Sequence, residues 1–174
     1  GEISEKLFSR GAKNINYVGG EPTPNTYTIL PSLRYQEGNV AQLWNSNMYC
    51  TVETMRLLWD VIDIWLPDFK YGRDSCAERF SKVDNYWAVV SRNHKEAYRE
   101  TVVPGTSTMI IRHLVMPNHV ECCTKPILRW VAENTPKVMV NIMQQYRPDH
   151  KVPYTPSLRD INRRITQKEY QQAL

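Results

Sequence analysis

Two periods of apolar residues alternate along this chain. Nearly continuous apolar runs bounded by Gly, Pro, Asn or Asp are typical of buried strands, whereas apolar residues three or four apart indicate helices with one buried face. Strands are predicted at residues 15–18, 42–45, 61–66, 108–116 and 138–143. Helices are predicted near residues 3–8, 27–34, 52–59, 87–99, 124–133 and 166–174. The chain is therefore one helix followed by five β/α units.

Residue types mark several helix ends. Gly11 follows the first helix as a stop, Thr51 is an N-cap, and Thr166 with Glu169 forms a capping box for the last helix. Pro31 weakens the second helix because proline removes a backbone donor.

Alternating strands and helices favour an α/β fold with a parallel sheet and helical crossovers. A complete (β/α)8 barrel has ~250 residues, so the 174 residues here supply part of one. A hydrophobic content of 41% can form one core, and the loop at residues 148–156 is too short to separate domains. We expect a single domain over residues 1–174.

Composition excludes several classes of function. The chain has 22 Lys and Arg against 18 acids and no basic run, so its net charge of +4 does not predict nucleic-acid binding. No apolar stretch approaches the ~20 residues of a membrane span, and no signal peptide is recognised at the start. Four irregularly spaced cysteines do not resemble a secreted disulfide framework. We expect a cytoplasmic, reduced protein.

Polar residues follow the first predicted strand. Gly19 and Gly20 let the backbone approach a ligand or take positive φ, and Pro22 biases Glu21 to an extended conformation. A carboxylate held at a strand end suits an ammonium ligand. It does not suit a phosphate, because the lysine and hydroxyl of a P-loop are absent. The alternative is a strand-to-loop turn with a solvated Glu.

The third predicted strand also ends in charge. Asp68 and Lys70 share one face with Leu66 and Ile64, so they extend an apolar row. Charges there are costly to bury unless they are paired or bind a ligand. They form either a ligand site or a mutual ion pair.

The second strand end offers the amides of Asn45 and Asn47 and the hydroxyl of Ser46, which suit ribose hydroxyls. Their alternative role is a helix-entry turn before Thr51.

Arg112 interrupts an apolar strand and needs an anion, which is either a ligand carboxylate or an acid such as Asp63. His113 faces the opposite side and is interpreted as a core histidine with satisfied hydrogen bonds.

Five stretches in order resemble one known superfamily. They are Gly19-Gly20-Glu21-Pro22 and the segments 44–49, 66–71, 111–114 and 119–126. They resemble radical S-adenosylmethionine enzymes, in the branch of pyruvate formate-lyase activating enzyme-like proteins. The resemblance implies a partial (β/α)6-type barrel whose first strand lies outside this chain.

The same resemblance implies a cofactor site. In these enzymes the Gly-Gly-Glu segment receives the methionine amino group of S-adenosylmethionine. The cofactor-binding residues expected by resemblance are Gly19, Gly20, Glu21, Asn45, Asn47, Asp68, Lys70 and Arg112. No catalytic residue is assigned.

One departure from the superfamily is large. The CxxxCxxC loop that holds its [4Fe–4S] cluster is absent, because no pair among Cys50, Cys76, Cys122 and Cys123 has CxxC spacing. We therefore expect the cluster ligands outside this chain, which is interpreted as N-terminally incomplete and inactive by itself.

His119, Glu121, Cys122 and Cys123 are residue types that can bind a metal, and they lie close together in the sequence. Adjacent cysteines do not easily ligate one Zn²⁺, and no fourth ligand has suitable spacing. No metal ligand is therefore predicted, and the segment is interpreted as a loop and helix cap, with a redox or substrate-contact role for the cysteines as the alternative.

The resemblance implies an enzyme that generates a 5′-deoxyadenosyl radical for hydrogen abstraction. The hydrogen donor would be a glycine of a glycyl radical enzyme, and flavodoxin or ferredoxin would supply the electron. A cluster-free module that binds a nucleoside or other small ligand is the alternative. A flavodoxin-like or Rossmann-like domain ranks last, because the phosphate loop of the first turn is missing.

Overall fold

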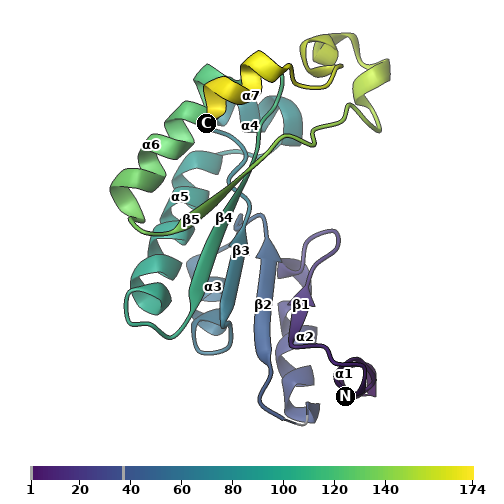
Figure 1. Ribbon diagram of the computed structural model, residues 1–174, viewed down its shortest axis with the longest axis vertical. Coiled ribbons are helices and arrows are strands. Elements are labelled where there is room, and N and C mark those ends of the chain that lie inside the picture. The colour runs from purple at the N-terminus through teal and green to yellow at the C-terminus, as the bar shows by residue number, and fades with distance from the viewer. Residues whose placement is uncertain (1, 37) are drawn as a thin grey trace. The chain divides into compact units, whose positions relative to one another are not determined.

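The computed structural model describes residues 2–36 and 38–174 of the chain. Its strands are β1 (Asn14–Tyr17), β2 (Ala41–Ser46), β3 (Ile64–Pro67), β4 (Thr108–Leu114) and β5 (Met139–Met143). They form one sheet in the order β1-β2-β3-β4-β5, labelled in Figure 1. The pairs from β1 to β4 are parallel, with Tyr17 opposite Trp44 and Trp44 opposite Trp65. The predicted α/β class with five sequential strands is confirmed.

Seven α-helices are assigned among the described residues, and six of them match helices that the sequence pattern predicts. They are α1 (Glu2–Ser9), α2 (Thr26–Ser32), α3 (Val52–Trp59), α4 (Asp74–Ser81), α5 (Tyr86–Ala97), α6 (Lys125–Asn134) and α7 (Gln167–Ala173). Helix α4 is the one that the sequence analysis missed. None of the helices in the described segments has the length and apolar composition needed to cross a bilayer.

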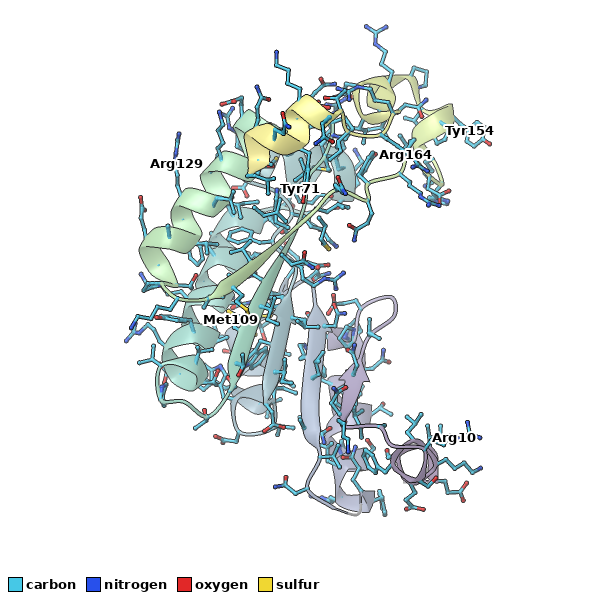
Figure 2. All side chains as sticks on the ribbon, viewed as in Figure 1. Arg10, Tyr71, Met109, Arg129, Tyr154 and Arg164 are labelled. Carbon is cyan, nitrogen blue, oxygen red and sulfur yellow. The ribbon has the colours of Figure 1, made fainter. Side chains whose placement is uncertain are left out.

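Short helical segments join these elements. The 3₁₀ segments are η1 (Thr23–Asn25), η2 (Leu33–Tyr35), η5 (Val152–Tyr154) and η6 (Pro156–Ile161). Two π-helical turns, η3 (Tyr98–Val102) and η4 (Val120–Thr124), lie after α5 and before α6. Side chains on this ribbon appear in Figure 2, where Tyr154 projects from η5 and is 86% exposed.

The helix caps expected from the sequence are present at the ends of α1, α3 and α7. Thr51 accepts a hydrogen bond from the backbone N–H of Thr54. Thr166 and Glu169 make both bonds of the capping box at the start of α7. Gly11 takes a φ of +89° and its N–H bonds the carbonyl of Phe8, which ends α1 as expected.

The chain divides into two compact units, each with its own core. Unit 1 comprises residues 1–68 and 89–110, and unit 2 comprises residues 69–88 and 111–174. In unit 1 the large buried side chains include Trp44, Met55 and Trp65. In unit 2 they include Phe69 and Ile127.

Candidate functional site

The turn after β1 is open. Gly19 has a φ of +102° and Gly20 a φ of +61°, and a Cβ at either position would meet nothing within 4 Å. The backbone conformation therefore requires glycine here, and the space beside the turn is unfilled by neighbouring protein atoms.

Glu21 is the centre of a hydrogen-bond network in unit 1. Its Oε1 accepts bonds from the hydroxyl of Thr23 at 2.5 Å, the hydroxyl of Ser46 at 2.7 Å and the N–H of Thr23 at 3.2 Å. Its Oε2 accepts the N–H of Asn47 at 2.8 Å. A carboxylate has about four lone-pair sites, two on each oxygen. One site on Oε2 is therefore still available for a further donor.

This network joins two strand ends. Ser46 is the last residue of β2, and Glu21 follows β1 by four positions. The half-buried carboxylate is thus held rigidly at the carboxyl end of both strands. The alternative of a turn with a solvated Glu21 does not account for these four hydrogen bonds.

The neighbouring strand ends lie at the same edge. The N–H of Asp68 donates to the carbonyl of Ser46 at 2.8 Å, which places Asp68 beside the Glu21 network. Asn47 uses its Oδ1 to accept the N–H of Tyr49 at 2.8 Å, as in an Asx turn. Because Oδ1 is used in this turn, the amide nitrogen Nδ2 is the atom of the Asn47 side chain suited to donate to a ligand. Within unit 1, these bonds place Glu21, Asn47 and Asp68 at the same edge of the sheet.

Asp63 lies at the opposite end of β3. Its Oδ2 accepts the N–H of Gln42 near the start of β2 at 2.7 Å. This carboxylate thus orders the amino ends of two strands, away from the Glu21 network.

An open groove of about 540 Å³ follows β2. It is lined by residues 49–53 together with Val89 and Arg92. Burial, followed by the nearby Glu21 charge, raises the pKa of the Cys50 thiol to about 12. Cys50 is therefore protonated at neutral pH and is a poor nucleophile in this groove.

In unit 2, Arg112 lies in β4, and Lys70 lies three residues beyond the end of β3 in the chain. The N–H of Lys70 donates to the phenolic oxygen of Tyr86 at 2.9 Å, and the N–H of Phe69 donates to the carbonyl of Arg112 at 2.9 Å. The Arg112 guanidinium lies 4.0 Å from the Met143 sulfur. The role of both side chains toward a cofactor stays a prediction.

His113 is a core histidine, as predicted. It is 1% exposed, with Nδ1 at 2.7 Å from the carbonyl of Phe69 and Nε2 at 2.8 Å from the hydroxyl of Thr124. Because a carbonyl only accepts, Nδ1 carries the proton and Nε2 accepts from Thr124. Burial lowers the pKa of His113, which keeps the ring neutral.

The structure adds Cys76 to the group formed by His119, Cys122 and Cys123. Sequence reasoning found no fourth ligand because it predicted no helix around residue 76. The helical spacing of Cys76, Ala77 and Phe80 was the available signal. Burial raises the pKa of the Cys76 and Cys123 thiols and lowers that of His119.

Together these observations define an α/β fold with polar residues at the carboxyl ends of parallel strands. No family model matches the chain. The chain is 48% identical over 163 residues to an uncharacterized protein of Methanocaldococcus jannaschii, covering 94% of this chain and 45% of that protein. The chain thus spans about half the length of this curated relative.

The fold also matches a solved structure. That structure is a domain of pyruvate-formate lyase-activating enzyme from Bacteroides vulgatus, with a TM-score of 0.67 and 17% identity. The match covers 93% of this chain and 91% of that domain. The two chains therefore share a fold, which is the one that the sequence motifs implied.

Proposed function

We propose that this chain is part of a radical S-adenosylmethionine enzyme resembling pyruvate formate-lyase activating enzyme. The observation that carries the proposal is the fixed carboxylate of Glu21 at the carboxyl ends of β1 and β2, next to the open Gly19–Gly20 turn. Ligands of parallel α/β folds bind at this edge. The shared fold with an activating-enzyme domain supports the same proposal.

Glu21 would bind the methionine ammonium of S-adenosylmethionine. Four donors hold its carboxylate, so little side-chain entropy is lost when an ammonium occupies the remaining lone pair of Oε2. Asp68 and the Nδ2 of Asn47 would contact the nucleoside.

The [4Fe–4S] cluster of these enzymes would supply one electron to the bound cofactor. The four cysteines of this chain do not fit that role, because no three of them have the CxxxCxxC spacing. Cysteines in the remainder of the full-length protein would hold the cluster. A glycyl radical enzyme would be the substrate partner, with flavodoxin or ferredoxin as electron donor.

The test is a calorimetric titration of the full-length, anaerobically reconstituted protein with S-adenosylmethionine. Glu21→Gln should weaken binding about 10-fold or more, since a hydrogen bond to a charged group contributes about 1.5–3 kcal/mol. Glu100→Gln, an exposed carboxylate of unit 1, is the matched control and should bind as wild type. Equal affinities for all three proteins would refute the assignment of Glu21.

A cluster-free ligand-binding module is the second candidate, and the missing cysteine motif favours it. Formation of 5′-deoxyadenosine by the reduced, reconstituted full-length protein separates the two. Product formation supports the enzyme, whereas binding without product supports the module.

A further inference from the structure

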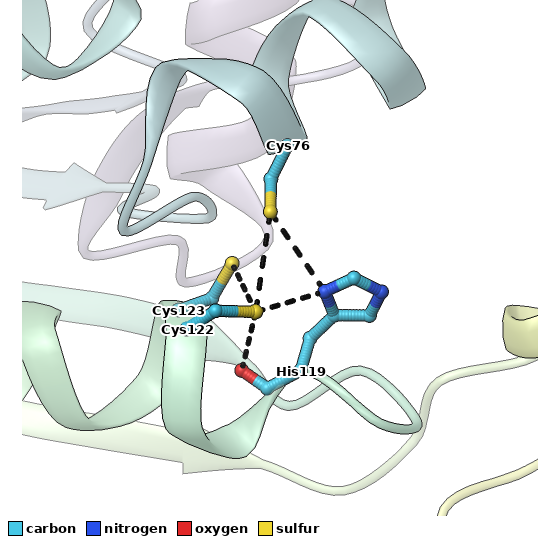
Figure 3. Close-up of side chains that lie close together, drawn as sticks. All are labelled: Cys76, His119, Cys122 and Cys123. Atoms are coloured by element: carbon cyan, nitrogen blue, oxygen red, sulfur yellow. Dashed lines mark hydrogen bonds between the residues drawn. The ribbon is translucent and has the colours of Figure 1, made fainter.

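A compact group of three thiols and one imidazole lies in unit 2, and none of its residues has a role in the function proposed above. Figure 3 shows Cys76, His119, Cys122 and Cys123 with their side chains pointing toward one another. Their ligand atoms all lie within 4.8 Å of one another. The group combines one residue of α4 with three from the segment between β4 and α6.

Four of the six separations within the group are close to the edges of a tetrahedron around one ion. Zn²⁺ bonds of ~2.3 Å to sulfur and ~2.0–2.1 Å to nitrogen place two sulfur ligands ~3.8 Å apart, and a sulfur and a nitrogen ~3.5 Å apart. The Sγ atoms of Cys76 and Cys122 are 4.0 Å apart, and so are those of Cys122 and Cys123. His119 Nδ1 lies 3.8 Å from Cys76 Sγ and 3.1 Å from Cys122 Sγ.

Adjacent cysteines can share an ion here because of the local backbone. Val120–Thr124 forms the π-helical turn η4, from which both sulfurs reach the same group. Gly72 packs against this turn so closely that a Cβ would lie 2.7 Å from the carbonyl oxygens of Cys122 and Cys123. The objection that adjacent cysteines do not easily ligate one ion is therefore met by this turn.

The outer contacts of His119 are those of a metal-binding histidine. Its Nε2 lies 3.4 Å from Asp160 Oδ2, which leaves Nδ1 directed at the thiols. Arg79 holds the same carboxylate through bonds of 2.9 and 2.6 Å. A carboxylate on the distal nitrogen fixes the tautomer and orientation of a metal-bound imidazole.

We propose that Cys76, His119, Cys122 and Cys123 bind one Zn²⁺ ion as a structural site of unit 2. Four protein ligands close the coordination sphere, which is characteristic of structural zinc. The ion would connect α4 to the β4–α6 segment, with Asp160 of η6 as its outer contact. A [4Fe–4S] cluster fits poorly, because its ligands bind separate iron atoms and must spread more widely than those of a single ion.

Differential alkylation of the unmodified chain tests this proposal without any variant. The reduced protein is treated with a thiol reagent with and without Zn²⁺, and the modified sites are mapped by mass spectrometry. Zinc should protect Cys76, Cys122 and Cys123, whereas Cys50, in unit 1, should react equally in both samples and so serves as the internal control. Equal reactivity of all four thiols with and without zinc would overturn the proposal.

Metal analysis and cobalt substitution give independent readouts. The chain and its Cys50→Ser control should each hold about one zinc ion, and Cys76→Ser should lose it. Cobalt should give tetrahedral d–d bands and thiolate charge-transfer bands in the control but weakened ones in Cys76→Ser. Asp160→Asn should lower zinc affinity about 10–100-fold. Zinc retained unchanged by Cys76→Ser, or iron with acid-labile sulfide in its place, would refute a zinc site.

Discussion

Replacing Glu21 by Gln should destabilise the strand ends as well as weaken ligand binding. In the native protein, three donors converge on Oε1 and one, the Asn47 N–H, on Oε2. Gln is nearly the same size, but one side of its amide is a donor. If its oxygen replaces Oε1, its NH₂ faces the Asn47 N–H, and if the amide flips, it faces the hydroxyls of Thr23 and Ser46.

The expected loss of stability in Glu21→Gln has two causes, the loss of one hydrogen bond and the loss of the negative charge. The bond to Asn47 is worth about 1.5–3 kcal/mol because its acceptor is charged, and the three bonds kept by a neutral oxygen weaken. Glu21 is half-buried, so solvent screening reduces each contribution. We expect a loss of about 3 kcal/mol, or about 6–12 °C in melting temperature for a chain of this length.

The assay is a thermal melt followed by circular dichroism, with a denaturant titration for the free energy of unfolding. Glu100→Gln should change stability by less than about 0.5 kcal/mol. Thr23→Val removes one hydroxyl donor and should cost about 1 kcal/mol. A melting temperature for Glu21→Gln equal to that of Glu100→Gln would show that the carboxylate does not hold the strand ends together.

Three further outcomes are expected. His94 is fully buried, and burial lowers its pKa to about 4. The folded state therefore favours the neutral ring, and the free energy of unfolding should fall by up to about 3 kcal/mol as the pH drops from 6.5 toward 4. A His94→Gln variant whose stability has the same pH dependence in denaturant titrations would contradict this. Gly72→Ala should displace the Cys122 backbone and weaken cobalt binding, whereas the exposed Ser75→Ala should not, as followed by the charge-transfer band. Thr166→Ala should cost about 1 kcal/mol by removing the cap of α7, and an unchanged denaturation midpoint would argue against that cap.

Most secondary structure was predictable because its signals are local. The capping box at Thr166 and Glu169 and the stop at Gly11 depend on a few neighbouring residues, and both formed as predicted. Helix α4 was missed because its eight residues, Asp74–Ser81, bury only Cys76 and Ala77 among polar neighbours. A short helix with so little apolar surface depends on tertiary packing for its stability.

The strand-end residues were predictable in position but not in their contacts. Alternation of strands and helices indicated that Glu21, Asn47 and Asp68 follow parallel strands, whose carboxyl ends share one edge. Thr23 and Ser46 together donate three hydrogen bonds to Glu21. The sequence could not show the bond from Ser46, because this residue is 25 positions away along the chain.

By itself, the sequence determined the parallel sheet, the order of its strands, six of the seven described helices, and which polar residues follow the strands. Hydrophobic periodicity and caps act over a few residues, so they can be recognised without coordinates. The thiol–imidazole group was decided by tertiary structure alone. Cys76 and His119 are 43 positions apart, and their contact requires α4 to pack beside η4. Spacing rules detect ligands that lie close along the chain, whereas a site assembled from two distant segments becomes visible only when the fold brings those segments together.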